Sequence, residues 1–260
     1  MFEKELKAMI HIADKVKGEI LKIYNQDFSV EIKEDNSPVT LADKTADRLI
    51  REFLLEQFPD YGILTEESTD DFSRLDKDYM FVVDPVDGTK DFVSKNGQFT
   101  TNIALVYKHQ VVAGVISIPA RNEMYFASKN QGAFYRNLNG EITKIHVNDK
   151  INDLTMLISN FHTTEQEKRI AQKHQDRISH VVGCGSAIKA CMIAHGKAEV
   201  SFRLNPNTKE WDTAAAQIIV LEAGGLFFEP NQKEITYNRR DVYNRNGFVI
   251  LNRIENLLIK

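Results

Sequence analysis

Hydrophobic positions in the first 60 residues recur at helical spacing. Apolar side chains three or four positions apart over residues 2–23 predict a long amphipathic helix. Thr40 is placed to cap a second helix, with Asp43 in its first turn and an apolar face that continues to Leu54. Residues 36–38 (Asn-Ser-Pro) predict a turn between the two. The chain is therefore expected to begin with a pair of helices.

The middle of the chain changes to shorter apolar runs. Runs at residues 61–64 and 80–83 predict buried strands, and an acidic residue follows each within two positions. Further strand-like stretches, separated by short polar turns, predict an antiparallel sheet. These stretches cover residues 102–107, 111–118, 124–127 and 132–135.

After about residue 150, predicted strands alternate with predicted helices. The strands cover 154–159, 180–182, 199–202, 225–228 and 248–251, and the helices cover 163–173, 186–195 and 211–223. We therefore interpret the fold class as α/β, composed of an α+β half (residues 1–150) and an α/β half (residues 151–260). No repeat or flexible linker separates the halves, so they are expected to pack as one body.

Composition narrows the class of protein. With 42% hydrophobic and 27% charged residues among 260, the chain is typical of globular proteins. A net charge of −4 gives no basic excess, which argues against a nucleic-acid polymer as partner. No stretch approaches the roughly 20 apolar residues of a membrane span, and the N-terminus lacks a signal-peptide core. We expect a cytoplasmic protein; peripheral membrane association and oligomeric state stay open.

One acidic turn is the most informative segment. Asp84 and Asp87 flank a turn that directly follows the apolar run, so both carboxylates can point into one space. Gly88 allows the chain to approach a ligand closely, and Thr89 stands at a predicted helix start, where free N–H groups attract phosphate. Carboxylates without His or Cys favour a hard cation such as magnesium. Acidic loops after strands are common, however, and this pair alone does not establish a metal site.

Two more acidic positions strengthen the metal hypothesis. Glu66 and Glu67 follow the first apolar run, and Asp212 begins the helix predicted from residue 211. Asp212 would also serve as an ordinary helix cap. Capping does not explain the adjacent Trp211 or the run of alanines that follows, which would let the helix approach the site closely. Trp211 is interpreted as a buried packing residue rather than a platform for a base.

These segments resemble a known family. Residues 62–67, 84–89 and 211–215, together with 39–43, are similar in order and spacing to the signature segments of the inositol monophosphatase superfamily. The resemblance covers essentially the whole chain. It implies a layered αβαβα fold and hydrolysis of phosphate esters that depends on Mg²⁺, with two or three ions.

The resemblance also implies the metal ligands. Glu66, Asp84 and the carbonyl of Val86 would hold a first magnesium ion. Asp84, Asp87 and Asp212 would hold a second. Glu67 is left as a neighbour of the site or a surface residue.

Catalytic roles follow from the same resemblance. Thr89 and Glu66 would orient the attacking water, Asp43 would bond to Thr89, and the N–H groups of Gly88 and Thr89 would receive the phosphate. The residues expected to contact substrate are Glu66, Val86, Asp87, Gly88, Thr89, Ser186, Lys189, Arg203 and Asp212.

Within the superfamily, residues 88–92, 96–105 and 185–189 resemble the 3'(2'),5'-bisphosphate nucleotidases. That branch acts on adenosine 3',5'-bisphosphate and usually has Glu at the position of Asp91, a departure expected to matter little. Ser186 and Lys189 stand at a glycine turn before a predicted helix, which suits a second phosphate. Arg203 could clamp that phosphate. Lys189 could instead be a solvated surface residue, although substrate contact is favoured, and Arg203 could equally be a surface charge. Lys209 and Tyr237 are candidates for the rim of the site.

The sequence therefore predicts an enzyme whose partner is a small phosphorylated nucleotide. An inositol or sugar phosphatase on the same scaffold is the first alternative, and it would not need Lys189 or Arg203. A non-catalytic magnesium or nucleotide sensor is a second, disfavoured because every expected carboxylate and Thr89 are present.

Overall fold

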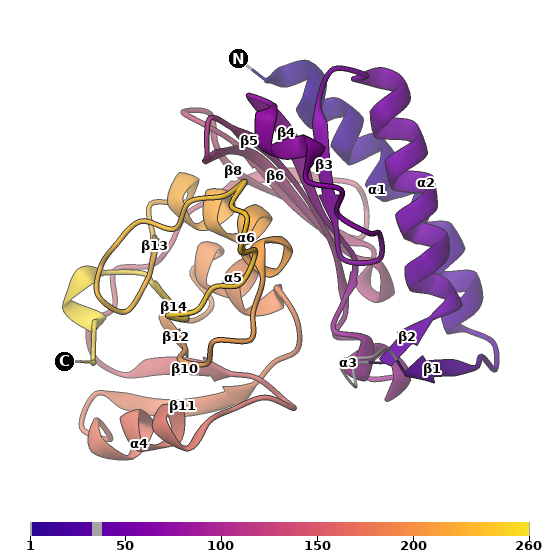
Figure 1. Ribbon diagram of the computed structural model, residues 1–260. Helices are drawn as coiled ribbons and strands as arrows, with labels where there is room; N and C mark the ends of the chain where they lie inside the picture. The colour runs from indigo at the N-terminus through magenta and orange to yellow at the C-terminus, as the bar shows by residue number, and fades with distance from the viewer. Residues whose placement is uncertain (1, 33–37, 260) are drawn as a thin grey trace.

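The computed structural model describes residues 2–32 and 38–259, and it begins with the predicted pair of helices. Helices α1 (Glu3–Tyr24) and α2 (Leu41–Gln57) lie side by side (Figure 1). Thr40 caps α2: its hydroxyl accepts from the Ala42 N–H at 3.1 Å, and Asp43 Oδ2 accepts from the Thr40 N–H at 2.8 Å. The predicted start of the second helix is confirmed. Two short strands, β1 (Val30–Ile32) and β2 (Pro38–Thr40), come between the helices in the chain and pair with each other. Of the predicted turn, residues 36 and 37 lie outside the described residues, and Pro38 begins β2.

A seven-stranded sheet follows, in the order β3-β4-β5-β6-β7-β8-β9. Strand β3 is parallel to β4 and every later pair is antiparallel. The antiparallel pairing of β5 through β8 confirms the prediction from the short polar turns that join these strands. The last strand was not predicted because three of its four residues are exposed. The strands are β3 (Gly62–Thr65), β4 (Tyr79–Asp87), β5 (Thr100–Tyr107), β6 (Gln110–Ile118), β7 (Glu123–Ser128), β8 (Gly132–Arg136) and β9 (Ile142–Ile145).

A five-stranded sheet contains the remaining strands, in the order β11-β10-β12-β14-β13. The predicted alternation of strands and helices is confirmed, but β14 runs antiparallel to both of its neighbours. The helix predicted from Ser186 begins two residues later, because Ser186 has a left-handed backbone with φ of 48°. The elements are β10 (Leu154–Ile158), α4 (Glu165–Lys173), β11 (Ile178–Gly183), α5 (Ile188–Ala194), β12 (Val200–Arg203), α6 (Glu210–Glu222), β13 (Leu226–Phe228) and β14 (Phe248–Leu251).

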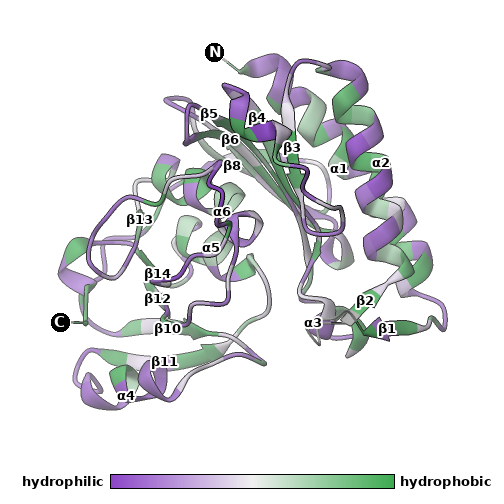
Figure 2. Ribbon diagram, in the orientation of Figure 1, coloured by the Kyte–Doolittle hydropathy of each residue, from purple (hydrophilic) through white to green (hydrophobic). Residues whose placement is uncertain are grey.

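These elements stack in the αβαβα order that the resemblance implied. Helices α1 and α2 cover one face of the seven-stranded sheet, α5 and α6 lie between the two sheets, and α4 covers the outer face of the five-stranded sheet (Figure 1). Apolar residues concentrate on the strands and on the helix sides that face them (Figure 2). Burial of these faces is the main force holding the layers together.

The alanine run of α6 packs against β6. A Cβ atom added at Gly114 would lie 2.9 Å from the carbonyl oxygen of Ala215 and 2.6 Å from Ile218, so only glycine fits at this crossing. Ala214, Ala215 and Ala216 are all buried in the core that the two sheets share. The alanines therefore permit a close approach to the sheet, and this approach sets the position of the helix.

No helix within 2–32 or 38–259 combines the length and apolarity that a bilayer crossing demands.

Candidate metal centre

Asp84 and Asp87 lie at the carboxyl end of β4, where the pairing with β5 is irregular. Asp84 is opposite Asn102 and Asp87 is opposite Thr100. The two residues of β4 between Asp84 and Asp87 therefore lie opposite the single residue of β5 between Asn102 and Thr100. Such a bulge changes which face of the sheet a side chain occupies and can bring positions three apart to one side. The apolar run that predicted this strand stops at Asp84, but the strand continues through Asp87, because apolar content alone does not reveal backbone pairing.

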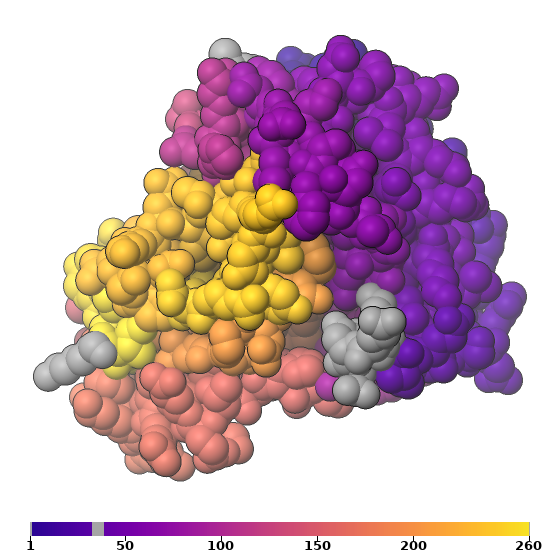
Figure 3. Space-filling view, viewed as in Figure 1, coloured from indigo at the N-terminus to yellow at the C-terminus, as the bar shows by residue number. Residues whose placement is uncertain are grey.

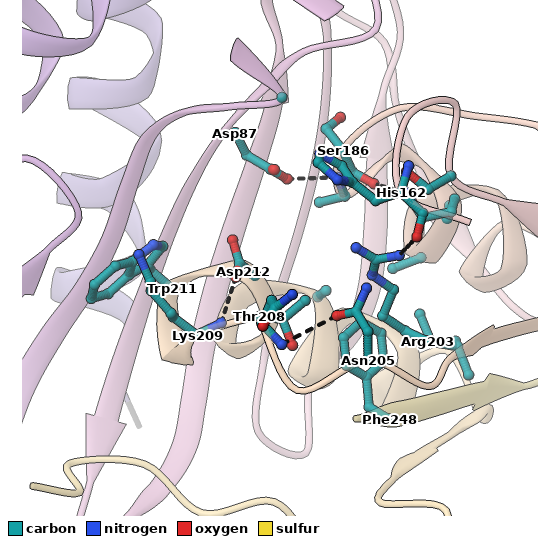
Figure 4. A pocket seen from close by; sticks show the side chains of 18 of the residues that line it. Asp87, His162, Ser186, Arg203, Asn205, Thr208, Lys209, Trp211, Asp212 and Phe248 are labelled. Atoms are coloured by element: carbon teal, nitrogen blue, oxygen red, sulfur yellow. Dashed lines mark hydrogen bonds between the residues drawn. The ribbon is translucent and has the colours of Figure 1, made fainter. Parts of the chain in front are cut away.

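Asp212 completes a cluster with these two residues. One carboxylate oxygen from each of Asp84, Asp87 and Asp212 lies within 4.8 Å of the others. Figure 4 shows Asp87 and Asp212 projecting into the same cavity, Asp87 from the end of β4 and Asp212 from the start of α6. Glu66, which follows β3, lines the same cavity. All four residues were predicted from the sequence, and folding gathers three of them into one cluster beside a cavity that Glu66 also lines.

Hydrogen bonds fix two of the three carboxylates. Asp87 Oδ2 accepts from the Ala187 N–H at 2.8 Å and from the Asn102 side-chain amide at 3.1 Å. Asp212 Oδ2 accepts from the Lys209 N–H at 2.5 Å. Asp84 is buried, and its Oδ1 atom has no hydrogen-bond partner. A buried carboxylate oxygen without a partner is costly unless a cation binds it.

The electrostatics of the cluster favour a cation. Burial raises the pKa of Asp84 well above its ordinary value, and the charges of Glu66, Asp87 and Asp212 raise it further. Burial, with Asp87 and Glu66, raises the pKa of Asp212 to about 8. Burial also raises the pKa of Asp87, although Lys189 opposes this. Each carboxylate makes ionisation of the others harder, and a bound cation would relieve that repulsion. Oxygen-only donors with one unpartnered oxygen fit a hard divalent metal.

Thr89 connects the cluster to the N-terminal helices. Its hydroxyl lies 3.3 Å from Asp43 Oδ1 and 3.3 Å from the Val86 carbonyl oxygen, so the hydrogen bond expected between Thr89 and Asp43 is present. Thr89 begins the short helix α3 (Thr89–Val93). Gly88 precedes it with φ of 89°, and a Cβ there would come within 3.2 Å of Ser186. Glycine is therefore required at position 88 for conformation and for space.

The cluster borders a cavity of 540 Å³ that positively charged side chains also line (Figure 4). Ser186, Lys189 and Arg203 line it, as expected. The Ser186 hydroxyl is buried without a hydrogen-bond partner. Lys189 Nζ donates to the carbonyls of Cys184 at 3.1 Å and Ser186 at 2.6 Å, and burial lowers its pKa. Arg203 donates to the His162 carbonyl. Neither cation is therefore a free surface charge.

One candidate for the rim of the cavity lies elsewhere, and several residues that were not predicted line the cavity. Tyr237, expected at the rim, is fully buried, and its hydroxyl lies 3.5 Å from that of Thr213. Trp211 borders the cavity but is buried in the shared core, as predicted. Sequence reasoning missed several lining residues, although some follow predicted strands, a position typical of sites in sheets. These are Ser159, His162, Asn205, Asn207 and Thr208.

Without divalent metal, the free energy of unfolding is expected to fall as pH rises from about 4 to about 8. The pKa of Asp212 is 3.8 when unperturbed and about 8 when folded, so between these values the folded state holds more protons than the unfolded state. The stability present at low pH is lost as pH rises through the folded pKa. Thermal melts at pH 6 and pH 8, with EDTA or Mg²⁺, should show a larger gain from Mg²⁺ at pH 8. An equal gain at both pH values would contradict the electrostatic assignment.

Comparisons with known proteins agree with this geometry. The model of the inositol monophosphatase family matches residues 2–259. A protein of Aggregatibacter actinomycetemcomitans named 3'(2'),5'-bisphosphate nucleotidase CysQ is 32% identical, covering 94% of this chain and 91% of its own. A protein of the same name from Escherichia coli K12 is 33% identical over 88% of this chain and 92% of its own.

Solved structures give the same result. The crystal structure of CysQ from Bacteroides thetaiotaomicron, described as a bacterial member of the inositol monophosphatase family, superposes with a TM-score of 0.85 at 32% identity and covers 97% of this chain and 99% of its own. An IMPase of Thermotoga maritima gives a TM-score of 0.81 at 26% identity, covering 96% of this chain and 92% of its own. The fold and the family predicted from the signature segments are confirmed. With its four segments in order and its carboxylates gathered at one cavity, the chain belongs to the inositol monophosphatase family.

Proposed function

We propose that this protein is a magnesium-dependent 3'(2'),5'-bisphosphate nucleotidase that converts adenosine 3',5'-bisphosphate to AMP and phosphate. The observation that carries the proposal is a single cavity lined both by carboxylates and by positively charged side chains. Asp87 and Asp212 line it together with Lys189 and Arg203, and Lys189 lies near enough to Asp87 to oppose the rise of its pKa. A substrate with a reacting phosphate bound through metal and a second, retained phosphate bound by the cations fits this combination of charges. The relatives that bear this name across most of the chain support it.

The metal site is proposed to hold two or three Mg²⁺ ions. Glu66, Asp84 and the Val86 carbonyl would hold one ion, and Asp84, Asp87 and Asp212 would hold another. Bound magnesium would lower the pKa of a coordinated water and stabilise the charge that develops on the phosphate oxygens. The oxygen-only donor set and the unpartnered Asp84 Oδ1 support this assignment.

The protein's own groups would orient the reactants. Thr89, with its hydroxyl near Asp43 and Val86, would hold the attacking water together with Glu66. The N–H groups of Gly88 and Thr89 would receive the reacting phosphate at the start of α3. Fixing water and phosphate in this way lowers the entropic part of the barrier.

The second phosphate would lie among Ser186, Lys189 and Arg203. The buried Ser186 hydroxyl has no partner in the structure and is available to donate to a phosphate oxygen. Lys189 already bonds two carbonyls, which holds its ammonium group on the cavity wall. An inositol monophosphatase would not need Lys189 and Arg203, so these residues favour the nucleotide over inositol phosphates. A cytoplasmic location stays a prediction from the sequence.

A substrate panel tests the proposal. With Mg²⁺, the protein should release phosphate from adenosine 3',5'-bisphosphate with a kcat/KM about 30- to 150-fold above that for inositol 1-phosphate, because loss of a charge-assisted contact typically costs about 2–3 kcal/mol. EDTA should abolish turnover, and excess Mg²⁺ should restore it. Preferred turnover of inositol 1-phosphate or a sugar bisphosphate would replace the proposal with the alternative phosphatase. Binding without hydrolysis of any ester would support the sensor.

A further inference from the structure

The start of α6, which carries Asp212, lies against a segment from near the C-terminus. We term residues 237–244 the flanking segment. Its Asn244 N–H donates to the Thr208 carbonyl at 2.7 Å, and the Asn244 side-chain amide donates to the Lys209 carbonyl at 2.9 Å. The residues that lead into the helix are therefore held by a segment about 35 positions further along the chain.

Glu210, the first residue of α6, forms several hydrogen bonds with the flanking segment. Its side chain is completely buried. Oε2 accepts from the Asn238 N–H at 2.9 Å, and Oε1 accepts from the Arg239 N–H at 2.9 Å and from Arg239 Nε at 3.1 Å. The backbone N–H of Glu210 donates to the Val242 carbonyl at 2.9 Å. One buried carboxylate thus joins the helix start to two consecutive backbone amides.

The positions of Glu210 and Asp212 on the helix are mechanically linked. Successive residues of an α-helix are rotated by about 100°, so residues two apart project on nearly opposite sides. Glu210 projects toward the flanking segment, and Asp212 projects toward Asp84 and Asp87. A rotation of the first turn that loosens the bonds of Glu210 would therefore also displace the Asp212 carboxylate.

The flanking segment is in turn anchored to the N-terminal half. Arg74 is 1% exposed; it donates from Nη1 to Asn238 Oδ1 at 2.9 Å and from Nη2 to the Arg239 carbonyl at 3.0 Å. The Asn238 side-chain amide donates back to the Arg74 carbonyl at 3.1 Å. In the space-filling view the yellow C-terminal part lies directly against the purple N-terminal part (Figure 3). Arg74 belongs to the segment between β3 and β4, which begins with Glu66.

We propose that Glu210 is a positioning residue for the metal site: it fixes the direction of Asp212 through the flanking segment and Arg74. The inference rests on the metal ligands assigned under the proposed function and adds to them a group that touches no ligand atom. Partners that orient metal ligands commonly change metal affinity by 10–100-fold when they are altered.

The test is Glu210→Gln, with Glu199→Gln as the matched control. Glu199 is also buried, and it accepts from the Thr155 N–H and the Asn148 amide, both at 2.6 Å. It precedes β12, at the end of that strand away from Arg203 and the cavity. Calorimetric titration of Mg²⁺ into metal-free protein without substrate should show about 10-fold weaker affinity for Glu210→Gln. The Mg²⁺ affinity of Glu199→Gln should stay within about twofold of the wild type, although its Tm should fall about as much as that of Glu210→Gln.

Two outcomes would overturn the proposal: Mg²⁺ affinity of Glu210→Gln within about twofold of the wild type, or an equal loss of affinity in Glu199→Gln. If Glu210→Gln does not fold, Asn238→Gly decides the question, since glycine accepts the φ of 59° and keeps the N–H that donates to Glu210. That variant loses its bonds to Arg74 and should bind Mg²⁺ more weakly; unchanged affinity would overturn the proposal. Because the titration contains no substrate, it remains decisive even if the proposed nucleotidase activity fails.

Discussion

Replacing Asp84 by Asn is expected to lower kcat/KM by at least about 10³-fold, because several kcal/mol of transition-state stabilisation depend on the metal and each 1.4 kcal/mol is a factor of ten. Asp84 is the ligand assigned to both magnesium ions. Its Oδ1 has no hydrogen-bond donor, so an amide there disturbs little of the surrounding structure. Steady-state kinetics with the bisphosphate nucleotide measure the effect.

The same variant should raise the Tm of the metal-free protein at pH 8. Removal of one charge relieves the repulsion that raises the pKa of Asp84 and its neighbours. Mg²⁺ should then add little stability to the variant and much more to the wild type. A variant that loses activity while its Tm still rises normally with Mg²⁺ would contradict the assignment of Asp84 as a ligand.

Asp87→Asn is a less clean experiment than Asp84→Asn. It too should remove most activity, but Asp87 Oδ2 accepts from the Ala187 N–H and the Asn102 amide. In the rotamer that turns its amide nitrogen toward those donors, asparagine would lose both hydrogen bonds, including the one to Ala187 in the second half of the chain. Loss of activity in this variant would therefore mix a metal effect with a structural one.

Local patterns in the sequence predicted most of the elements because their causes are local. The Thr40 cap and the spacing of apolar residues in α1 depend on neighbours within one or two turns. Strand β9 was missed because its sheet pairing, and not an apolar alternation, defines it. The bulge between Asp84 and Asp87 was missed for a similar reason, since it exists only relative to β5.

The residues of the candidate site were selected from the sequence, but the residues that hold them in position were not. Carboxylates, Thr89 and Ser186 stand in segments that resemble a family, so their types and order were sufficient. Arg74 and Glu210 carry charge, and sequence reasoning gives such residues no reason to be buried. Arg74 is buried between Asp70, four positions away, and Asn238, which is 164 positions away. Pairing over that separation is a property of the folded chain.

Replacing Thr89 by Val is expected to lower kcat by about 10²–10³-fold, a typical effect for loss of a group that orients proton transfer. Valine keeps the shape of threonine and removes only the hydroxyl, which lies 3.3 Å from both Asp43 Oδ1 and the Val86 carbonyl. The metal ligands stay in place, so calorimetric Mg²⁺ affinity and KM should change by no more than about threefold. Asp43 is a poorer target, because its Oδ2 also accepts from Thr40 at the cap of α2.

Thr89→Ser supplies the matched control, since it retains the hydroxyl and loses one methyl group. It should keep kcat within about 10-fold of the wild type, because the hydrogen-bonding group remains and only its rotamer preference is relaxed. Equal losses in the Val and Ser variants would mean that packing of the methyl group, and not the hydroxyl, matters at this position. A loss of Mg²⁺ affinity in Thr89→Val as large as the loss of kcat would instead make Thr89 a support for the Val86 carbonyl, and the orientation of water would then rest on Glu66.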